Sequence, residues 1–179
     1  MIVDILNEIL NYSNLTNQKR ITQIDKNSHD NLYIYSLNVP IFMSQKILEH
    51  KIFSRLTKLR CHGNYGIYDV GHLCNTLKML ECCECAIDQN GISKLKYLEI
   101  IICRKNKKIK DVNHLADTLI ELDCGCRCGI DQNGIAQLKY LKKIDCFQNK
   151  KIKNVNHLAN TLKELGCDWE CGIDQNGIS

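Results

Sequence analysis

Cysteine offers more chemistry than any other residue type in this sequence, because twelve cysteines occur among 179 residues. Cys82 and Cys85 have the C-x-x-C spacing of a zinc knuckle, and Cys124, Cys126 and Cys128 place three more thiols close together. Structural zinc requires four tetrahedral ligands, which often come from two such pairs. Zinc binding is therefore the first chemical hypothesis, and the positions of the remaining cysteines test it.

Most of the cysteines recur at fixed positions of an internal repeat. The segment Ile-Asp-Gln-Asn-Gly-Ile occurs at 87–92, 130–135 and 173–178, and successive copies start 43 residues apart. Each period contains two units of the pattern apolar-x-x-apolar-x-Cys, followed three or four residues later by Asn or Cys. The six units are Leu56/Leu59/Cys61/Asn64, Leu77/Leu80/Cys82/Cys85, Leu98/Ile101/Cys103/Asn106, Leu119/Leu122/Cys124/Cys128, Leu141/Ile144/Cys146/Asn149 and Leu162/Leu165/Cys167/Cys171.

This regular placement indicates that most of the cysteines pack in a core. Only Cys74, Cys83 and Cys126 lie outside the two repeated positions. Free cysteine behaves as a small hydrophobic side chain, which suits a column between columns of leucine. We therefore predict no metal ligand and no cofactor, with zinc binding kept as an alternative function. We also expect free thiols in a reducing compartment, with Cys83 and Cys126 exposed.

The six units resemble the leucine-rich repeat, L-x-x-L-x-L-x-x-N/C-x-L, which has a period of about 20–29 residues. The resemblance covers residues 56–179 in units of 21 or 22 residues, the last incomplete, with Cys at the third apolar position throughout. It implies an α/β solenoid with short parallel strands on a concave side and short helices and turns on a convex side. Because side chains alternate along a strand, the apolar residue and the Cys point into a core that stacking makes continuous.

The segments between the expected strands suit short helices and turns. Ile109, Val112, Leu115 and Leu119 have helical spacing, and Asp111 is placed as their N-cap. The other unit type carries Asn-Gly, a turn signal because both residues tolerate positive φ. The resemblance to the leucine-rich repeat also implies that the side chain at the Asn/Cys position bonds to backbone groups exposed by the bend after the strand. One extra residue before Cys128 and before Cys171 predicts a local bulge.

Residues 1–55 lie outside these six units, and we expect a helical segment there. Residues 4–12, followed by Leu15, Ile21, Ile24 and Asp25-Lys26, resemble an F-box, although the usual Leu-Pro start and late Trp of that family are missing. The resemblance implies that Ile5, Leu6, Ile9 and Leu10 contact the adaptor of a cullin ubiquitin ligase through residues 1–35, while the repeats recruit the substrate. The alternative is a helical cap over the first unit. A further helix is expected between Pro40 and Phe53. The combination is similar to repeat proteins of giant DNA viruses or amoebae.

The concave face of the expected sheet is the candidate binding surface, because its side chains flank the inward-pointing pair on each strand. Arginine and aromatic residues dominate the energetics of protein interfaces, so Phe147 and Trp169 are the predicted centre of binding. The candidate partner-binding residues are Arg60, His62, Glu81, Cys83, Ile102, Arg104, Asp123, Asp145, Phe147, Asp168 and Trp169.

Other functions find less support in the sequence. A net charge of +4 is weak for nucleic-acid binding, and no aromatic residues interleave with the lysines at 107–110 and 150–153. The recurring His72, His114 and His157 are expected to be repeat-surface residues. We find no catalytic motif, no signal sequence and no run of 18 apolar residues. We therefore expect a non-enzymatic protein-interaction module in the cytoplasm, or in the host cytoplasm if viral. It would be an F-box-type ligase subunit or, alternatively, a stand-alone leucine-rich-repeat scaffold.

Overall fold

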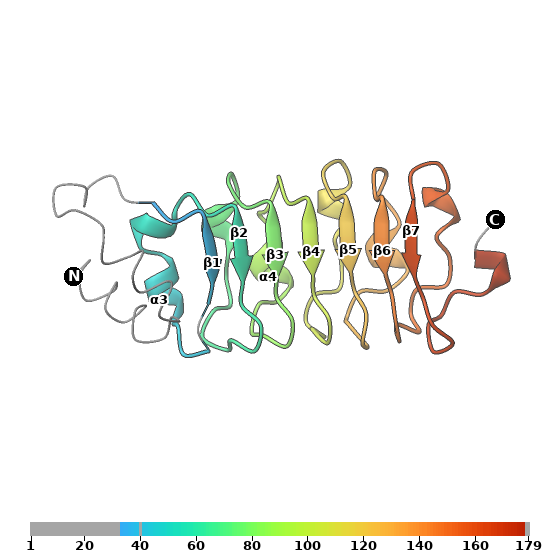
Figure 1. The fold of residues 1–179 in the computed structure, drawn as a ribbon, viewed down its shortest axis with the longest axis horizontal. Helices are drawn as coiled ribbons and strands as arrows, with labels where there is room; N and C mark the ends of the chain where they lie inside the picture. Colours follow the sequence, from blue (N-terminus) through green and yellow to red (C-terminus); the bar gives the residue numbers. More distant parts are fainter. Residues whose placement is uncertain (1–32, 40, 178–179) are drawn as a thin grey trace.

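The computed structural model describes residues 33–39 and 41–177, and these form one parallel sheet with short helical segments beside it. The sheet has seven strands in the order of the sequence (Figure 1). They are β1 Ser36–Asn38, β2 Lys58–Arg60, β3 Met79–Glu81, β4 Ile100–Ile102, β5 Glu121–Asp123, β6 Lys143–Asp145 and β7 Glu164–Gly166. The helical segments are α3 Gln45–Leu48, η2 Lys51–Phe53, η3 Gly71–Leu73, α4 Gln89–Ile92, η4 Asn113–Leu115, η5 Asn133–Ile135, η6 Asn156–Leu158 and η7 Gln175–Gly177. The expected α/β class with parallel strands is confirmed.

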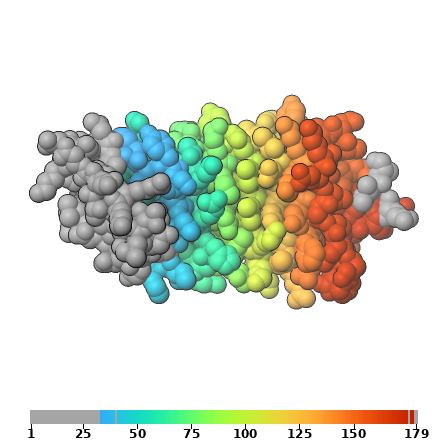
Figure 2. All heavy atoms as spheres, viewed as in Figure 1, coloured from blue at the N-terminus to red at the C-terminus, as the bar shows by residue number. Residues whose placement is uncertain are grey.

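Successive strands pair in a fixed register, so equivalent residues of the repeat lie side by side. Leu59 pairs with Leu80, and Leu122 pairs with Ile144. The middle residue of each strand from β1 to β6 is buried, and both of its neighbours are more exposed. In Figure 2 the colours follow the sequence along the long axis, so each stretch of chain packs mainly against the preceding and following units. The expected alternation of inward and outward side chains is confirmed.

The sheet begins one unit earlier than predicted, because β1 precedes the expected boundary at residue 56. Ile34, Leu37 and Val39 have the apolar-x-x-apolar-x-apolar pattern, with Val in the place of Cys. Leu37 and Val39 are both buried in the common core. The helix expected between residues 40 and 53 is present as α3 and η2. The adaptor contacts predicted at Ile5, Leu6, Ile9 and Leu10 lie outside the described residues.

A recurring glutamine forms hydrogen bonds to the backbone of the unit that follows it. The same bonds at Gln45 identify the segment after β1 as one more unit. Gln89 Oε1 accepts hydrogen bonds from the backbone N–H groups of Lys110 and Asp111, both at 2.9 Å, and its Nε2 donates to Asp111 O. Gln132 makes the equivalent bonds to residues 153 and 154. Gln45 makes them to residues 68 and 69. The same bridge therefore occurs three times along the stack.

In alternate units the asparagine of the repeat binds the backbone at the bend after the strand, as expected. Asn106 Nδ2 donates to the carbonyl oxygens of Cys82 at 3.1 Å and Ile87 at 2.9 Å. Its Oδ1 accepts from the N–H groups of Lys108 and Ile109. Asn64 and Asn149 are buried in the same way. Since buried backbone groups need partners, this side chain satisfies four of them at once.

The glycine of the Asn-Gly pair has a different role from the one predicted. Gly91 and Gly134 lie in α4 and η5, and neither has positive φ. A Cβ atom would lie 2.2 Å from Tyr68 O at Gly91 and 2.1 Å from Lys110 O at Gly134. Glycine is therefore needed because the backbone of the preceding turn approaches closely. The expectation of a turn with positive φ at this pair was wrong.

The bends after the strands contain the left-handed residues instead. Glu84, Lys105 and Gln148 each have φ between 49° and 58° at this position. In the unit with the extra residue before Cys128, two consecutive residues, Cys126 and Arg127, are left-handed. The bulge predicted for this unit is therefore present as a wider bend.

The recurring histidines lie between successive turns of the repeat. Nε2 of His114 and Nε2 of His157 each lie 3.1 Å from a backbone carbonyl oxygen of the preceding unit, at Ile92 and Ile135 respectively. Burial lowers the pKa of His114, which favours its neutral form. These side chains therefore link neighbouring units. Among the described residues, no helix is long and apolar enough to cross a membrane.

Candidate protein-binding face

The outward side of the sheet carries two columns of strand residues. We use the name sheet face for these two columns and the residues that follow each strand. The first column is Lys58, Met79, Ile100, Glu121, Lys143 and Glu164, and the second is Arg60, Glu81, Ile102, Asp123, Asp145 and Gly166. Five of the residues predicted to bind a partner lie in the second column. The parallel register holds these side chains about 4.8 Å apart from strand to strand.

A hollow of about 460 Å³ lies at the end of the sheet face where β2 to β5 lead into their bends. It is lined by His62, Glu81, Cys83, Glu84, Ile102, Arg104, Lys105, Asp123 and Cys126. Six of these were predicted as binding residues, so the structure brings more than half of that set together. A second hollow, lined by residues that include Tyr97, Glu99 and Ile120, lies at the opposite ends of the strands.

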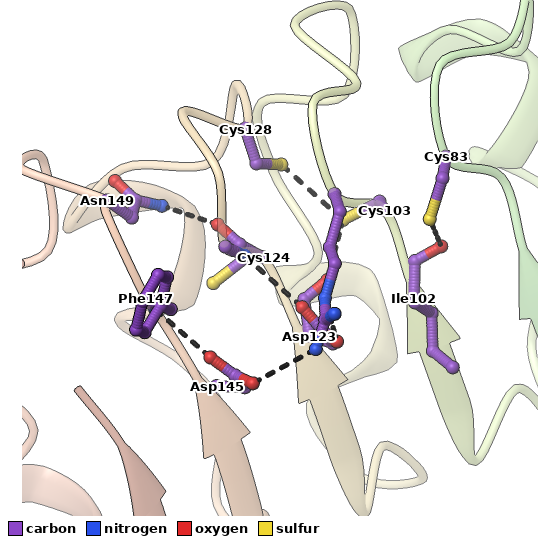
Figure 3. A network of polar contacts seen from close by, with 11 residues as sticks. Cys83, Ile102, Cys103, Asp123, Cys124, Cys128, Asp145, Phe147 and Asn149 are labelled. Atoms are coloured by element: carbon purple, nitrogen blue, oxygen red, sulfur yellow. Dashed lines mark hydrogen bonds and ion pairs between the residues drawn. The ribbon is translucent and has the colours of Figure 1, made fainter. Parts of the chain in front are cut away.

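Arg104 organises the charged part of this hollow. Its Nε lies 2.6 Å from Asp123 Oδ2, and its Nη2 lies 3.1 Å from Asp145 Oδ2. The hydrogen bond to Asp123 and both negative charges raise the pKa of the guanidinium, which therefore stays protonated. Asp145 also accepts a hydrogen bond from the backbone N–H of Phe147 at 3.0 Å (Figure 3). One network thus connects β4, β5 and the bend after β6.

Further ion pairs run between neighbouring strands of the face. Arg60 Nε lies 3.2 Å from Glu81 Oε2, and Lys143 Nζ lies 2.9 Å from Glu164 Oε2. Exposed pairs of this kind contribute little to stability, because water and salt screen them. Their main consequence is the pattern of charge that a partner would meet.

The two predicted aromatic anchors are both available to a partner. Phe147 is 45% exposed and Trp169 is 89% exposed, so neither is buried against a neighbouring loop. Asp168, which precedes Trp169, accepts a hydrogen bond at 3.0 Å from the backbone N–H of Gln148. That bond holds the bend after β7 against the bend after β6.

The prediction that Cys83 is exposed was wrong. Its side chain is 6% exposed, and its thiol lies 3.7 Å from the carbonyl oxygen of Ile102 (Figure 3). Burial raises its pKa to about 11, so it stays protonated near neutral pH and is a weak nucleophile. Cys126 is partly exposed, as expected.

Three residues that line the hollow, namely Glu84, Lys105 and Cys126, were not predicted as binding residues. Glu84 and Lys105 each follow the middle residue of a strand by four positions, and their side chains pair at 3.3 Å. Their shared place in the repeat is a signal that would have revealed them, because equivalent residues of adjacent units lie side by side.

The expectation of free thiols was wrong at one place. The structure joins Cys167 and Cys171 by a disulfide, whereas the other ten cysteines are free. Cys61, Cys82, Cys103, Cys124 and Cys146 are all buried and belong to the core, as their column predicts.

The sheet face thus combines charged networks, partly exposed Ile and Met side chains and two exposed aromatic residues beside a shallow hollow. Comparison with known proteins adds no further assignment: no protein-family model matches the chain, and no curated protein matches it significantly.

Proposed function

We propose that the chain is a leucine-rich-repeat solenoid that acts as a non-enzymatic protein-interaction module through its sheet face. The repeat type is supported by the step of 21 or 22 residues, the parallel strands and the buried asparagine at alternate bends. These are the features by which such repeats satisfy their backbone and close their core.

One observation carries the proposal: inward positions are nearly uniform from unit to unit, whereas outward positions differ. The middle strand residue from β2 to β7 is always Leu or Ile, and the residue two positions later is always Cys. The second outward column reads Arg, Glu, Ile, Asp, Asp and Gly over the same strands. A surface that does not repeat offers one composite site, which fits a specific polypeptide partner better than a repeating ligand.

Lysine modification in the presence and absence of a captured partner tests this use of the face. Lys58 and Lys143 lie on the face, and Lys105 lines the hollow, so binding should protect them from an amine-reactive reagent. Lys94, Lys139 and Lys163 are exposed elsewhere and should react at an unchanged rate. Protection of the second group alone would contradict the proposal.

The finer proposal is an F-box-type subunit of a cullin ubiquitin ligase in the cytoplasm, or in the host cytoplasm if the chain is viral. Its support is the sequence of residues 4–12, together with the finding that the range assigned to the adaptor, 1–35, precedes β1. In this arrangement the first segment would bind the adaptor and the repeats would recruit the substrate.

Co-purification with the cullin adaptor separates the ligase subunit from a stand-alone scaffold. Ile5→Asp, Leu6→Asp and Ile9→Asp together should abolish adaptor binding, because they place charges on the apolar positions. The matched control, Asn7→Asp with Asn11→Asp, changes polar positions of the same segment and should leave binding intact. If the unchanged chain does not associate with the adaptor, the scaffold is the correct alternative.

A further inference from the structure

The repeated cysteines form three sets with nearly the same spacing, and the sets differ in exposure. They are Cys61/Cys82/Cys85, Cys103/Cys124/Cys128 and Cys146/Cys167/Cys171. Every member of the first two sets is buried. Their thiols form hydrogen bonds within the core, as between Cys103 Sγ and Cys128 Sγ at 3.5 Å (Figure 3). The cysteines of these two sets therefore serve as packing residues of the core.

The third set is more open. Cys146 is buried, but Cys171 is half-buried and Cys167 is exposed. The three Sγ atoms all lie within 4.8 Å of one another. The Cα atoms of Cys167 and Cys171 are 5.7 Å apart, so both side chains reach the same point beside Cys146.

We propose that the reduced form of Cys146, Cys167 and Cys171 binds one thiophilic d10 cation, with Zn²⁺ as the ion that fits best. A zinc–sulfur bond of about 2.3 Å places two thiolates on one tetrahedral ion roughly 3.8 Å apart. Once the disulfide is reduced, Cys167 and Cys171 can separate their sulfur atoms to this distance by side-chain rotation, because their Cα atoms are 5.7 Å apart. The fourth position faces solvent on the side of Cys167 and takes a water molecule.

The backbone holds these ligands in place independently of any ion. Cys146 N–H donates to Gly166 O at 2.8 Å, which fixes the end of β6 against β7. Cys171 N–H donates to Asp168 O at 3.0 Å and closes the bend that carries the other two thiols. A site that is already ordered loses less conformational entropy when the ion binds.

Charge explains why this set binds an ion and the other two do not. Three thiols lose three protons when they bind Zn²⁺, so the complex carries one net negative charge. Water can solvate that charge beside the exposed Cys167. In the first two sets all three thiols are buried, so the same net charge would be largely removed from water, which is costly. This proposal stands independently of the proposed partner-binding function.

The disulfide and the ion are alternative states of the same cysteines. Reduction of the Cys167–Cys171 bond adds two electrons and two protons and yields two thiols. In the experiment a phosphine supplies the electrons and is oxidised to its phosphine oxide, with water as the source of oxygen. Only then are all three sulfur ligands available.

The test uses the full chain, stripped with a chelator and reduced by the phosphine without oxygen. Titration with Zn²⁺ should saturate at one ion per chain and change the fluorescence of Trp169, which is the only Trp in the sequence and lies between Cys167 and Cys171. Co²⁺ in place of Zn²⁺ should give the charge-transfer absorption of thiolate ligands.

The decisive variant is Cys167→Ser with Cys171→Ser, since neither residue is fully buried and the fold should persist. Its affinity should fall more than about 100-fold, because loss of an outer partner of a metal ligand already costs 10–100-fold. Cys74→Ser with Cys126→Ser changes two free thiols outside the set and should bind normally. Circular dichroism confirms that both variants are folded.

Three outcomes would overturn the proposal. One is no Zn²⁺ bound by the reduced unchanged chain, and another is equal binding by the folded Cys167/Cys171 variant. The third is binding lost with His62→Ala, because His62, Glu81 and Cys83 also place three donor atoms within 4.8 Å of one another. The Glu81 carboxylate is already paired with Arg60 at 3.2 Å, so we expect His62→Ala to bind Zn²⁺ normally.

Discussion

Inward and outward residues of the same strands follow opposite rules. In β5, Leu122 is buried and aligned with Ile101 and Ile144, whereas Glu121 and Asp123 on either side are partly exposed. The inward columns are uniform because every unit must fit the same space between its neighbours. The outward columns have no such requirement and can vary. The comparison teaches that packing fixes the inward positions and leaves the outward positions free to vary, and substitutions on each side test that separation.

The largest expected loss of stability comes from the inward column. Leu122→Ala should lower the free energy of unfolding by about 4 kcal/mol, because it removes a fully buried side chain and leaves a cavity. Its neighbour on the face provides the control, since Glu121→Ala should change it by less than about 0.5 kcal/mol. Urea unfolding followed by circular dichroism measures both. Similar losses for the two variants would refute the separation.

The buried asparagine should come next. Asn106→Ala leaves two carbonyl and two N–H groups of the backbone without their partner, which should cost about 3 kcal/mol. Asn90→Ala changes an exposed asparagine of α4 and should cost under about 0.5 kcal/mol. The same urea experiment compares them. Equal, small effects would mean that water replaces the side chain at the bend.

A smaller effect should appear when alkaline pH ionises the core thiols. Burial, together with neighbouring thiols, raises the pKa of Cys124 well above its ordinary value of 9.0. The folded state therefore keeps a proton that the unfolded state releases, so stability is complete below pH 9 and falls above it. At pH 10 this thiol alone should account for a loss on the order of 1 kcal/mol.

Unfolding of the reduced chain between pH 8 and pH 10 measures this loss. Cys124→Ala removes the thiol and should give a shallower dependence on pH, whereas Cys74→Ala, which changes a partly exposed thiol, should retain the steeper one. Identical slopes for the unchanged chain and Cys124→Ala would contradict the assigned burial of this group.

The uniform side of the molecule was predictable from the sequence, because a spacing of 21 or 22 residues and the columns of Leu, Ile, Cys and Asn reflect packing alone. The strand β1 escaped notice because Val39 replaces the Cys that marked every other unit. The reason for glycine at position 134 was not predicted either. Glycine is needed there because Lys110 O approaches closely, and no local sequence pattern encodes this contact between units. Cys83 was placed correctly at the end of its strand, but its burial depends on the chain that follows β4.

The sheet face is harder to predict because its residues do not repeat from unit to unit. Sequence position identified Arg104, Asp123 and Asp145 as outward, but not that one guanidinium pairs with both carboxylates. Nor did it show the hollow, which depends on how three adjacent bends are shaped by left-handed residues.

The most direct test measures how tightly a chain carrying both Phe147→Ala and Trp169→Ala binds a captured partner. Both side chains are exposed, so the free energy of unfolding should change by less than about 1 kcal/mol. The affinity should fall at least about 30-fold, which corresponds to roughly 2 kcal/mol for hot-spot aromatic residues. Tyr97→Ala with Tyr140→Ala removes two exposed aromatic residues outside the face and should bind as the unchanged chain does. Unchanged affinity in the Phe147/Trp169 variant, with the fold intact, would contradict the assignment of the sheet face as the binding surface.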